Sequence, residues 1–457
     1  MPGDAFALLR PRIRAKAPMK VVVLGAGITG LATAWYLCND GHEVTVIDKN
    51  TGPGLGTSYA NGAQLSYSYV APLAGPGVLP KIPPWLLRRD SPLRFYPAFD
   101  RQQWRWLVAF VRACTREQSD LTTRRLLTLS FYSRDLMHAF VASDAGRRFD
   151  FGYARNGKLV VFSDAEGFEG ARRLVDYQRS LGCEQFALGA DECRALEPAL
   201  ADPESALGKR MTGGIHTPSE EVGDCYAFCV GLEMLMRERG VTFAYDTPVR
   251  HLRAAGRATP SIAAIETPRG TFAADAYVLA SGAASPFLVR ELGLYLPIYP
   301  LKGYSISVPA TGRAPRISIT DFKRKVVYAP LRTSEGEPPG RATPHGELRA
   351  AGMADLAGYE ARIDPVRLGQ LVKEAREAFP NAAANHYDAE ASKPWAGLRP
   401  ATPKGTPILG RSWFSNLFLN VGHGALGWTL ALGSGRAVAD IVAGREPAIS
   451  LEGFALD

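Results

Sequence analysis

The hydrophobic pattern near the start of the chain changes its period within one uncharged stretch. Residues 21–38 (VVVLGAGITGLATAWYLC) carry no charge, and the stretch is long enough for a transmembrane helix or the apolar core of a signal peptide. Its glycines decide against both interpretations, because residues 21–24 form a β-branched run, residues 25–30 a turn and residues 31–37 a helical pattern. The stretch therefore predicts a strand, a tight turn and a helix.

The turn has the spacing Gly25-x-Gly27-x-x-Gly30. Between a strand and a helix, this spacing is the dinucleotide-binding fingerprint. We expect Gly25 to make the tight turn, Gly27 to let the backbone approach a pyrophosphate, and Gly30 to let the helix pack closely on the strand. The helix N-terminus would then offer N–H groups and a partial positive charge to the phosphates. A glycine-rich turn without a ligand is the competing interpretation.

A second strand and a long loop follow this helix. Residues 43–48 (EVTVID) end in Asp48, which lies 18 residues beyond Gly30 and suits a carboxylate that accepts hydrogen bonds from an adenosine ribose. NAD and FAD both use this arrangement, but an NAD enzyme usually continues into further alternating strands and helices. Here residues 51–64 are a loop of small residues, in which the hydroxyls of Thr57 and Ser58 can reach pyrophosphate and ribityl oxygens. The loop favours FAD, which is the more extended cofactor.

The remaining strands of a nucleotide-binding fold come much later in the chain. Residues 240–249 and 275–282 are predicted to be strands, the second ending in a small-residue turn. A cofactor domain built from separated segments implies that another domain is inserted between them. For that domain, residues 151–162, 304–308 and 325–329 alternate or are rich in β-formers, as in a mixed sheet.

Two helices are predicted between these strands. Residues 102–114 carry an apolar stripe at helical spacing, which predicts the buried face, and a second helix follows through Leu126 and Leu136. The stripe consists of Trp104, Leu107, Val108, Val111 and Cys114. The expected fold class is α/β, with a Rossmann-like FAD-binding domain and an interleaved α+β substrate domain that contains an antiparallel or mixed sheet. The predicted segments are 19–70, 215–295 and 390–457 for FAD, 71–214 and 296–389 for the substrate, and 1–18 as a basic N-terminal extension.

Composition and charge change this picture little. With 53 Lys and Arg against 45 Asp and Glu, the formal net charge is +8, but the basic residues are dispersed among acidic ones except between residues 10 and 20. Nucleic-acid binding needs clustered cations, so a solvated basic surface is the simpler interpretation. The six cysteines have no paired CxxC spacing, so neither a metal site nor a disulfide framework is expected. A reduced, cytoplasmic protein fits this pattern.

Taken together, several motifs resemble one flavoprotein family. The chain is similar to the D-amino-acid dehydrogenase branch of the glycine oxidase and D-amino-acid oxidase superfamily, from about Met19 to the C-terminus. The motifs that carry the resemblance are GAGITGLATAWYL, TSYANGAQLS, YPLKGYS, WAGLRPATPKGTPILGR and NVGHGALGWTLALGSG. The resemblance implies non-covalent FAD and a second domain whose sheet roofs the flavin. It also implies oxidation of the Cα–N bond of an amino acid to an imino acid, which water hydrolyses to a 2-oxo acid and ammonia.

The resemblance further assigns residues to FAD. These are Ile28, Thr29, Asp48, Lys49, Thr57, Ser58, Asn61, Gly62, Ala63, Val249, His423, Gly424, Ala425, Leu426, Gly427, Trp428 and Thr429. The stretch from His423 matches the segment that ends under the pyrimidine ring of the flavin. A helix from Trp428 onward would aim its N-terminal dipole at the flavin O2 position and stabilise the negative charge of reduced flavin.

Four side chains are candidates for a role in catalysis. Arg399, in the motif GLRP, matches the family's carboxylate-binding arginine, whose planar guanidinium would hold the substrate so that Cα–H points at flavin N5. Tyr304 and Tyr328 are expected on strands that face the flavin, where either can donate its hydroxyl to the substrate carboxylate. His423 is interpreted as a flavin-loop residue, with a proton role as the alternative. A surface salt bridge for Arg399 and structural burial for the tyrosines are the competing interpretations.

The sequence also departs from the family pattern. Some glycine oxidases have a second arginine where Ala425 stands, and Lys404 occupies a turn in which an acid is common. Residues 332–345 are longer than a hairpin loop requires, so they are expected to be an exposed loop, with substrate gating as the sharper interpretation. Residues 70–95 are rich in proline and end in arginines; a loop over the active site and a peripheral membrane surface where a quinone is met are the two interpretations.

The leading hypothesis is FAD-dependent oxidative deamination of D-amino acids, by hydride transfer from Cα to flavin N5, with a quinone or another acceptor taking the electrons. We expect a cytoplasmic protein, in one alternative peripheral on the inner face of the membrane, that binds no nucleic acid. An oxidase that uses O2 and a proline or hydroxyproline dehydrogenase are the nearest alternatives. A flavin-containing nucleic-acid or regulatory binder is an alternative from a different class.

Overall fold

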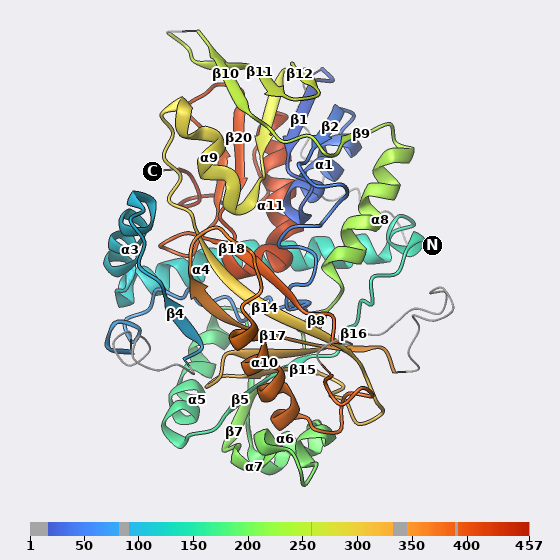
Figure 1. Cartoon of the computed structure of the whole chain (residues 1–457), viewed down its shortest axis with the longest axis vertical. Helices are drawn as coiled ribbons and strands as arrows, with labels where there is room; N and C mark the ends of the chain where they lie inside the picture. The colour runs from blue at the N-terminus through green and yellow to red at the C-terminus, as the bar shows by residue number, and fades with distance from the viewer. Residues whose placement is uncertain (1–16, 82–90, 257, 332–344, 389–391, 457) are drawn as a thin grey trace.

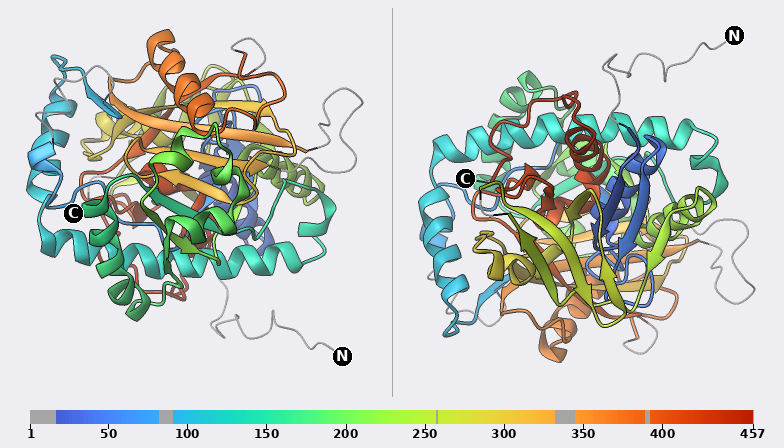
Figure 2. Two further views of the ribbon diagram at one scale, coloured as in Figure 1. Left: turned by 90° about the horizontal axis from the view of Figure 1, so that it is seen from below. Right: turned by 90° about the horizontal axis from the view of Figure 1, so that it is seen from above.

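The computed structural model describes residues 17–81, 91–256, 258–331, 345–388 and 392–456, which form two lobes (Figure 1). The lobe at the top of Figure 1 contains a six-stranded sheet, and the lobe at the bottom contains a nine-stranded sheet. Each sheet takes its strands from segments that are distant in the sequence, so the chain passes repeatedly between the lobes. The long helix α4 (Arg116–Ala142) crosses behind the junction between them (Figures 1 and 2).

The six-stranded sheet has the order β19-β20-β13-β1-β2-β9. Its strands are β1 (Lys20–Leu24), β2 (Glu43–Ile47), β9 (Thr242–Ala244), β13 (Ala276–Leu279), β19 (Ile408–Arg411) and β20 (Leu417–Val421). All pairs are parallel except β19 with β20. With α1 (Ile28–Asn39) after β1, the uncharged stretch is strand, turn and helix, as predicted. In the described residues, no helix has the length and apolar character needed to cross a membrane.

Both faces of this sheet are covered. Helices α1, α8 (Cys225–Glu238) and α11 (Gly427–Val442) pack on one face with α4, in a core that includes Val21 and Val23 of β1. On the other face, Val22 and Leu24 pack against a three-stranded sheet made of β10 (His251–Ala255), β11 (Ser261–Thr267) and β12 (Gly270–Phe272). Burial on both faces explains why the parallel strands are apolar runs and do not alternate.

Helices α1 and α11 lie in close contact and are fixed by charges at one end. At Gly435 of α11 an added Cβ would lie 2.8 Å from the backbone carbon of Ala32, so only glycine permits this approach. Asp40, after the last turn of α1, pairs with Arg436 at 2.7 Å and also with Arg445. The pairing fixes the helices relative to each other, and therefore fixes where their N-termini point.

The nine-stranded sheet is mixed, as predicted. Its order is β18-β14-β17-β16-β15-β5-β7-β6, and β4 also pairs with β17. The strands are β4 (Leu93–Phe95), β5 (Lys158–Phe162), β6 (Phe186–Gly189), β7 (Gly213–Thr217), β14 (Tyr299–Pro309), β15 (Ser318–Asp321), β16 (Val326–Leu331), β17 (Glu347–Leu356) and β18 (Trp395–Ala401). β5 with β15 and β4 with β17 are parallel pairs, and the remaining pairs are antiparallel.

The two faces of this sheet have different roles. One face packs against α6 (Ala190–Leu196), α7 (Ala206–Arg210) and α10 (Pro365–Ala378), in a core that includes Tyr304 and Ile306. The opposite face, which carries Gly303 and Ser305, looks toward the upper lobe, because the Ser305 hydroxyl donates to the carbonyl oxygen of Ala60 at 2.6 Å. Since side chains alternate along a strand, this contact identifies the residues that face the cavity between the lobes.

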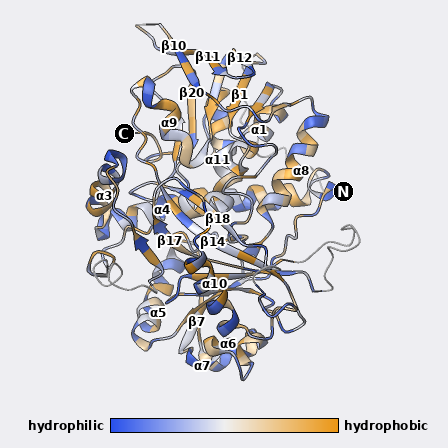
Figure 3. Ribbon diagram, in the orientation of Figure 1, coloured by the Kyte–Doolittle hydropathy of each residue, from blue (hydrophilic) through white to orange (hydrophobic). Residues whose placement is uncertain are grey.

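The predicted buried face of helix α3 (Arg101–Ala113) is wrong. Trp104, Val108 and Val111 of the predicted stripe are 48%, 50% and 48% exposed. The buried residues are Gln103, Trp106, Phe110 and Ala113. Trp106 donates to the carbonyl oxygen of Ala401 at 2.8 Å and stacks on Phe110. Helix α3 carries exposed as well as buried apolar residues, and Figure 3 shows apolar and polar residues mixed along it, so periodicity alone could not identify the buried face.

The predicted domain boundaries stay a prediction. Strand β18 lies within the segment 390–457 assigned to FAD, yet it pairs with β14 in the nine-stranded sheet. Three predicted segments lie wholly or partly outside the described residues: the basic extension up to residue 16, residues 82–90 of the proline-rich stretch, and nearly all of the 332–345 loop.

Candidate active site

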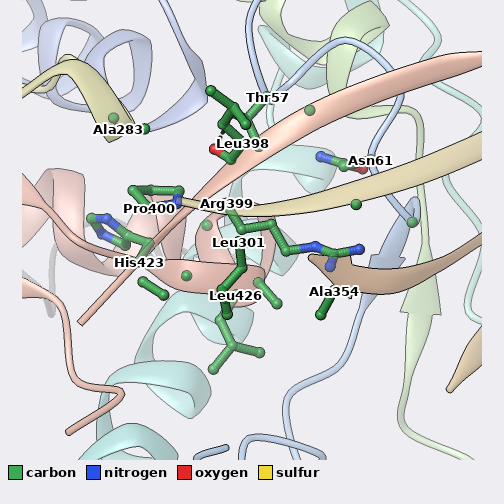
Figure 4. Close-up of a pocket in the computed structure, with 18 of the residues that line it drawn as sticks. Thr57, Asn61, Ala283, Leu301, Ala354, Leu398, Arg399, Pro400, His423 and Leu426 are labelled. Atoms are coloured by element: carbon green, nitrogen blue, oxygen red, sulfur yellow. Dashed lines mark hydrogen bonds between the residues drawn. The ribbon is translucent and has the colours of Figure 1, made fainter. Parts of the chain in front are cut away.

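A cavity of about 2050 Å³ lies between the two lobes. Its upper wall is formed by the carboxyl ends of β1, β2 and β13, the place where open α/β sheets bind ligands. Its lower wall is the Gly303 face of the nine-stranded sheet, and Figure 4 shows part of this region. The volume is well above the roughly 300–1,000 Å³ of small-molecule pockets, which leaves room for an extended cofactor together with a substrate.

The three glycines of the fingerprint have different surroundings. Gly25 has a φ of +118°, and a Cβ there would lie 2.5 Å from the carbonyl oxygen of Ala280. A Cβ at Gly30 would lie 2.0 Å from the carbonyl oxygen of Gly25. At Gly27 the nearest atom to an added Cβ is the Ser58 hydroxyl oxygen at 3.5 Å, so this position opens onto the cavity. The space beside Gly27 fits a phosphate group.

The N-terminus of α1 points its backbone donors at this space. Its N-cap residue, Gly27, offers no side-chain cap, and the first turn carries no acidic residue. Ser58 accepts a hydrogen bond from the Ile28 N–H at 3.0 Å, so the Ser58 hydroxyl is oriented by the helix itself. N–H groups of a first turn have no intrahelical partner, so those beyond Ile28 can be offered to an anion such as a pyrophosphate.

Asp48 is held rigidly at the carboxyl end of β2. One carboxylate oxygen accepts from the Ala26 N–H at 2.7 Å, and the other accepts from the backbone and side chain of Asn50 at 2.8 and 2.9 Å. Asp48, Lys49 and Val249 line the cavity, as the predicted contacts with the adenosine half of FAD require. Each carboxylate oxygen can accept more than one hydrogen bond, so these contacts leave room for a ribose hydroxyl. The ribose contact of Asp48 remains a prediction.

The loop from Thr57 to Ala63 is fastened to the lower lobe. The Thr57 hydroxyl donates to the carbonyl oxygen of Leu398 in β18 at 2.7 Å. The Asn61 side chain accepts from the Ala63 N–H at 2.9 Å, and Ala63 has a φ of +56°, which is unusual for a residue other than glycine. Such backbone strain is common at ligand sites. This loop therefore presents its backbone to the cavity beside Asn61 and Gly62.

The N-terminal end of helix α11 forms another wall of the cavity. It begins at Gly427 after a short 3-10 turn (Gly424–Leu426), and its N-cap residue provides no side-chain hydrogen bond. The side chains of the first turn are already engaged, because Trp428 donates to the Gly223 carbonyl oxygen at 3.0 Å and Thr429 accepts from the Ser66 N–H at 3.1 Å. The Trp428 ring packs among Phe151 and Phe228, so in this stretch the backbone is what faces the cavity.

His423 is buried beside the cavity. Its Nε2 lies 3.1 Å from the Ser434 hydroxyl, and its segment forms a β-bridge with Ala401. Burial lowers the pKa of His423 to about 3, so the ring is neutral at physiological pH. A group with this pKa is a poor proton acceptor near pH 7, which opposes the alternative of a proton role. The structure supports His423 as a packing and loop-positioning residue.

The burial of His423 makes stability depend on pH. In the unfolded chain a histidine titrates near pH 6.5, so between about pH 6.5 and 3 the unfolded state binds more protons than the folded one. Stability should therefore fall as the pH falls through this window, by up to about 1.4 kcal/mol per pH unit from this group. In urea denaturation between about pH 6 and 4, the wild type should lose stability more steeply than His423→Gln. Parallel pH dependences would contradict the assignment.

Arg399 reaches into the cavity from β18. Its guanidinium lies over Gly303, where an added Cβ would be 2.3 Å from Nη2, and its Nη1 donates to the Met353 carbonyl oxygen at 2.7 Å. Figure 4 shows the side chain extended toward Ala354 beside Leu301. Met353 has a φ of +62°, which turns this carbonyl toward the arginine at a point where the strand register shifts.

Arg399 has spare hydrogen-bonding capacity and charge. Burial lowers its pKa, and the nearby carboxylate of Asp355 opposes that shift. Asp355 is itself paired with Arg367 at 2.6 Å, and both side chains are buried. In the described part of the chain Arg399 forms no ion pair, so a carboxylate brought by a ligand would be its partner. The arrangement leaves Arg399 available to a ligand carboxylate, and its carboxylate-binding role stays a prediction.

Tyr304 and Tyr328 do not face the flavin side, and this expectation is wrong. The Tyr304 residue contributes to the cavity lining, but its hydroxyl donates to Asp355 at 3.3 Å and its ring lies in the core on the α10 face. The Tyr328 ring packs edge-on against Phe379, and its hydroxyl donates to the Glu374 carbonyl oxygen at 3.4 Å. The sequence predicted both strands but not which of their side chains point into the cavity. The contact of Ser305 with Ala60 shows which face of the sheet lines the cavity.

Two ionisable residues of the cavity region were missed by the sequence analysis. Lys158 stands at the start of the buried strand β5 and lines the cavity. Glu220 lies in the turn before β8 (Glu221–Val222), which pairs with β3 (Gln64–Leu65). A lysine that opens an apolar strand (KLVVF) was the available signal. Among the described residues, no cluster of His, Cys, Asp or Glu is arranged to hold a metal ion.

Comparisons with known proteins agree with this geometry. Residues 20–441 match the family model described as FAD dependent oxidoreductase. D-amino acid dehydrogenase 2 of Ralstonia nicotianae is 49% identical, over 96% of this chain and 100% of that protein. D-amino acid dehydrogenase of Paramagnetospirillum magneticum is 42% identical, over 96% and 98%. The crystal structure of glycine oxidase from Geobacillus kaustophilus is 21% identical with a TM-score of 0.73, over 97% of this chain and 99% of that one, a likeness that shows the fold.

Proposed function

This chain belongs to the family of FAD dependent oxidoreductases, and on that premise we propose that it is a D-amino-acid dehydrogenase. The observation that carries the substrate class is Arg399, an arginine without an ion-pair partner among the described residues, which lines the same cavity as the dinucleotide turn. The names of relatives at 49% and 42% identity support the D configuration and the use of an acceptor other than O2.

In this proposal each wall of the cavity has one task. Bound FAD supplies the hydride acceptor, held by the Gly27 turn and the first-turn donors of α1. Arg399 binds the substrate carboxylate as a planar fork, which orients the Cα–H bond and fixes the amino acid in the cavity. The sheet face under Arg399 excludes water, since Gly303 and its neighbours are buried.

The proposed reaction is tested by its products and its acceptor. With a small D-amino acid and a quinone analogue under nitrogen, the protein should form one 2-oxo acid and one ammonia for each quinone reduced. Release of peroxide in air, at a rate equal to that of quinone reduction, would support the oxidase alternative instead. Preference for proline or hydroxyproline, with a ring-retaining product and no ammonia, would support the secondary-amine alternative.

A peripheral contact with an anionic membrane surface is the second part of the proposal. The exposed face of α3 carries Trp104, Val108 and Val111, and Phe99 just before it is fully exposed. Arginines 101, 105 and 112 are exposed on the same helix. An apolar face with aromatic residues and a basic rim is suited to the interface of a bilayer, where a quinone is met.

This membrane contact predicts a specific loss of binding. The double change Trp104→Ser with Val108→Ser should reduce co-sedimentation with vesicles of phosphatidylglycerol at least several-fold, because it removes two of the four exposed apolar side chains that would enter the headgroup region. Trp413→Ser is the matched control, since Trp413 is 65% exposed on the β19–β20 connection of the upper lobe. Equal sedimentation of both variants and the wild type would contradict the contact.

A further inference from the structure

Two residues of opposite charge are buried at the Ser66 side of the cavity, away from Arg399. Lys158 and Glu220 are 2% and 1% exposed. Within the described residues they form no direct ion pair, although each is the other's principal countercharge. Burying two charges without direct contact is costly unless they share protons or serve a bound group. The arrangement therefore calls for an explanation beyond packing.

Lys158 faces the same side of the sheet as Arg399. Strand register carries this face from Ser305 to Ala351, Val327, Thr320 and Val160, and Lys158 lies two residues before Val160. The strand order separates β18 from β5 by four intervening strands, or roughly 24 Å at the usual spacing. Lys158 is thus a wall of the cavity but lies too far from Arg399 to hold the same small amino acid.

The contacts of the pair leave one oxygen atom without a partner. Lys158 Nζ donates to the Ser66 hydroxyl at 2.9 Å and lies 4.2 Å from the centre of the Tyr69 ring. One Glu220 oxygen accepts from the Ser68 N–H at 2.7 Å. The other, Oε2, has no hydrogen-bond partner among the described residues, which is unusual for a buried carboxylate. A protonated carboxyl group at this position would be cheaper to bury than a carboxylate.

The electrostatics place both titrations near neutral pH. Desolvation lowers the pKa of Lys158 to about 8, opposed by Glu220, and desolvation raises the pKa of Glu220 to about 7, opposed by Lys158. The other groups that face the pair are Tyr67, Tyr69, Cys183 and Glu221, and Glu221 is itself bonded to His138, Tyr153 and Tyr67 and paired with Arg155. A proton can therefore be gained or lost at this pair near neutral pH.

Ser66 connects this pair to the helix that would lie at the pyrimidine end of the flavin. Its hydroxyl accepts from Lys158, and its N–H donates to the Thr429 hydroxyl at 3.1 Å in the first turn of α11. Gln64, Ser66, Lys158 and Thr429 all line the cavity. Through Ser66, two hydrogen bonds link the Lys158 ammonium group to Thr429 at the N-terminus of α11. This is the helix N-terminus that would stabilise reduced flavin.

We propose that Lys158 and Glu220 are a proton-binding pair that takes up a proton from solvent when the flavin is reduced, and so balances the negative charge of the reduced cofactor. The inference rests on the proposed function only in requiring bound FAD. These residues are positioning residues, because they act on the cofactor through charge and do not hold the substrate. The proton ends on the Glu220 carboxylate, and no other reactant is needed.

The pair predicts how many protons accompany reduction. Burial raises the pKa of Glu220 and lowers the pKa of Lys158, so both groups change protonation state near neutral pH, Glu220 before Lys158 as the pH rises. Negative charge on the flavin raises the proton affinity of Glu220, so reduction near pH 7.5 should bind more than one proton per two electrons. At low pH, where the pair is already fully protonated, the pair should add no proton to those that the flavin itself takes up.

The experiment is an anaerobic spectroelectrochemical titration of the FAD-loaded protein at several pH values, which needs no amino-acid substrate. Lys158→Met should lower the equilibrium constant for flavin reduction about tenfold near pH 7.5, or about 30 mV for a two-electron couple. It should also reduce the proton count to one. Lys158→Arg keeps the positive charge and leaves Glu220 able to take up the proton, so it should restore most of the potential and its pH dependence.

The matched control is Lys302→Met. Lys302 is also a buried lysine in the same sheet, near a tyrosine ring, but it lies on the opposite face, where it donates to the Arg362 carbonyl oxygen. The variant Lys302→Met should therefore leave the flavin reduction potential unchanged. The proposal is overturned if Lys158→Met and Lys302→Met have the same potential and proton count as the wild type. Absence of reduction by D-amino acids with a normal pH-dependent potential would contradict the proposed substrate while leaving the pair intact.

Discussion

Arg399→Met should lower kcat/KM for a D-amino acid by about 100- to 1000-fold while FAD remains bound. The guanidinium is positioned over Gly303 by the Met353 carbonyl oxygen, and it has no ion pair in the described chain. Loss of a buried, charge-assisted contact with a substrate carboxylate costs about 3–4 kcal/mol, which is the expected change. Steady-state kinetics with the flavin absorbance recorded in parallel measure both quantities.

Two further variants make this prediction specific. Arg399→Lys keeps the charge but loses the planar fork, so it should lie between the wild type and Arg399→Met. Arg411→Met removes an exposed arginine from β19, which does not line the cavity, and should have no effect. A normal KM in Arg399→Met would exclude Arg399 as the carboxylate site.

Gly27→Ala should weaken FAD binding by at least about 100-fold without unfolding the protein. The backbone at Gly27 has a φ of −75°, which alanine adopts freely, and the added Cβ would make an ordinary contact with Ser58. The methyl group would instead occupy the space in which a phosphate must approach the α1 N-terminus. Fluorescence titration of the apoprotein with FAD measures the affinity, and urea denaturation of the apoprotein measures the stability.

Two other glycines separate binding from folding. Gly30→Ala would place its Cβ 2.0 Å from the Gly25 carbonyl oxygen, so it should destabilise the apoprotein by more than about 2 kcal/mol. Gly369→Ala, in the exposed part of α10 with no atom within 4 Å, should stabilise it by up to about 1 kcal/mol. If Gly27→Ala binds FAD like the wild type, the phosphate is not held at this turn.

The cofactor half of the site could be predicted because its chemistry is local. Gly25, Gly27 and Gly30 lie within six residues, and their spacing describes both the turn and the helix that follows. The structure agrees in each of the three positions, since two exclude a side chain and one opens onto the cavity. Short-range geometry of this kind is determined by the backbone and is therefore visible in one sequence.

The substrate half could not be predicted to the same depth. It depends on which face of a strand or helix is buried, and on contacts between residues that are distant in the sequence. Tyr328 was placed on a real strand but on its wrong face, which a one-residue change of register decides. Helix α3 has two apolar faces, and only its packing on Tyr299 and Ala401 selects one. Lys158 and Glu220 are 62 residues apart in the sequence, so no local pattern could bring them together.

The departures from the family pattern have a structural context. Ala425, which stands where some glycine oxidases have a second arginine, lies in the short turn before α11 and lines the cavity. Arg399 therefore has no arginine neighbour from this turn, and the Met353 carbonyl oxygen is what orients it. A single oriented guanidinium is sufficient to hold one carboxylate through two parallel hydrogen bonds.

Reduction of the bound flavin by an amino acid in the absence of oxygen tests the central claim most directly. The FAD-loaded protein is mixed anaerobically with a panel of D-amino acids and their L enantiomers, and the flavin absorbance is followed. The account predicts that D-amino acids bleach the flavin and that the L enantiomers leave it oxidised. Flavin that dithionite reduces but that no D-amino acid in the panel reduces would contradict it.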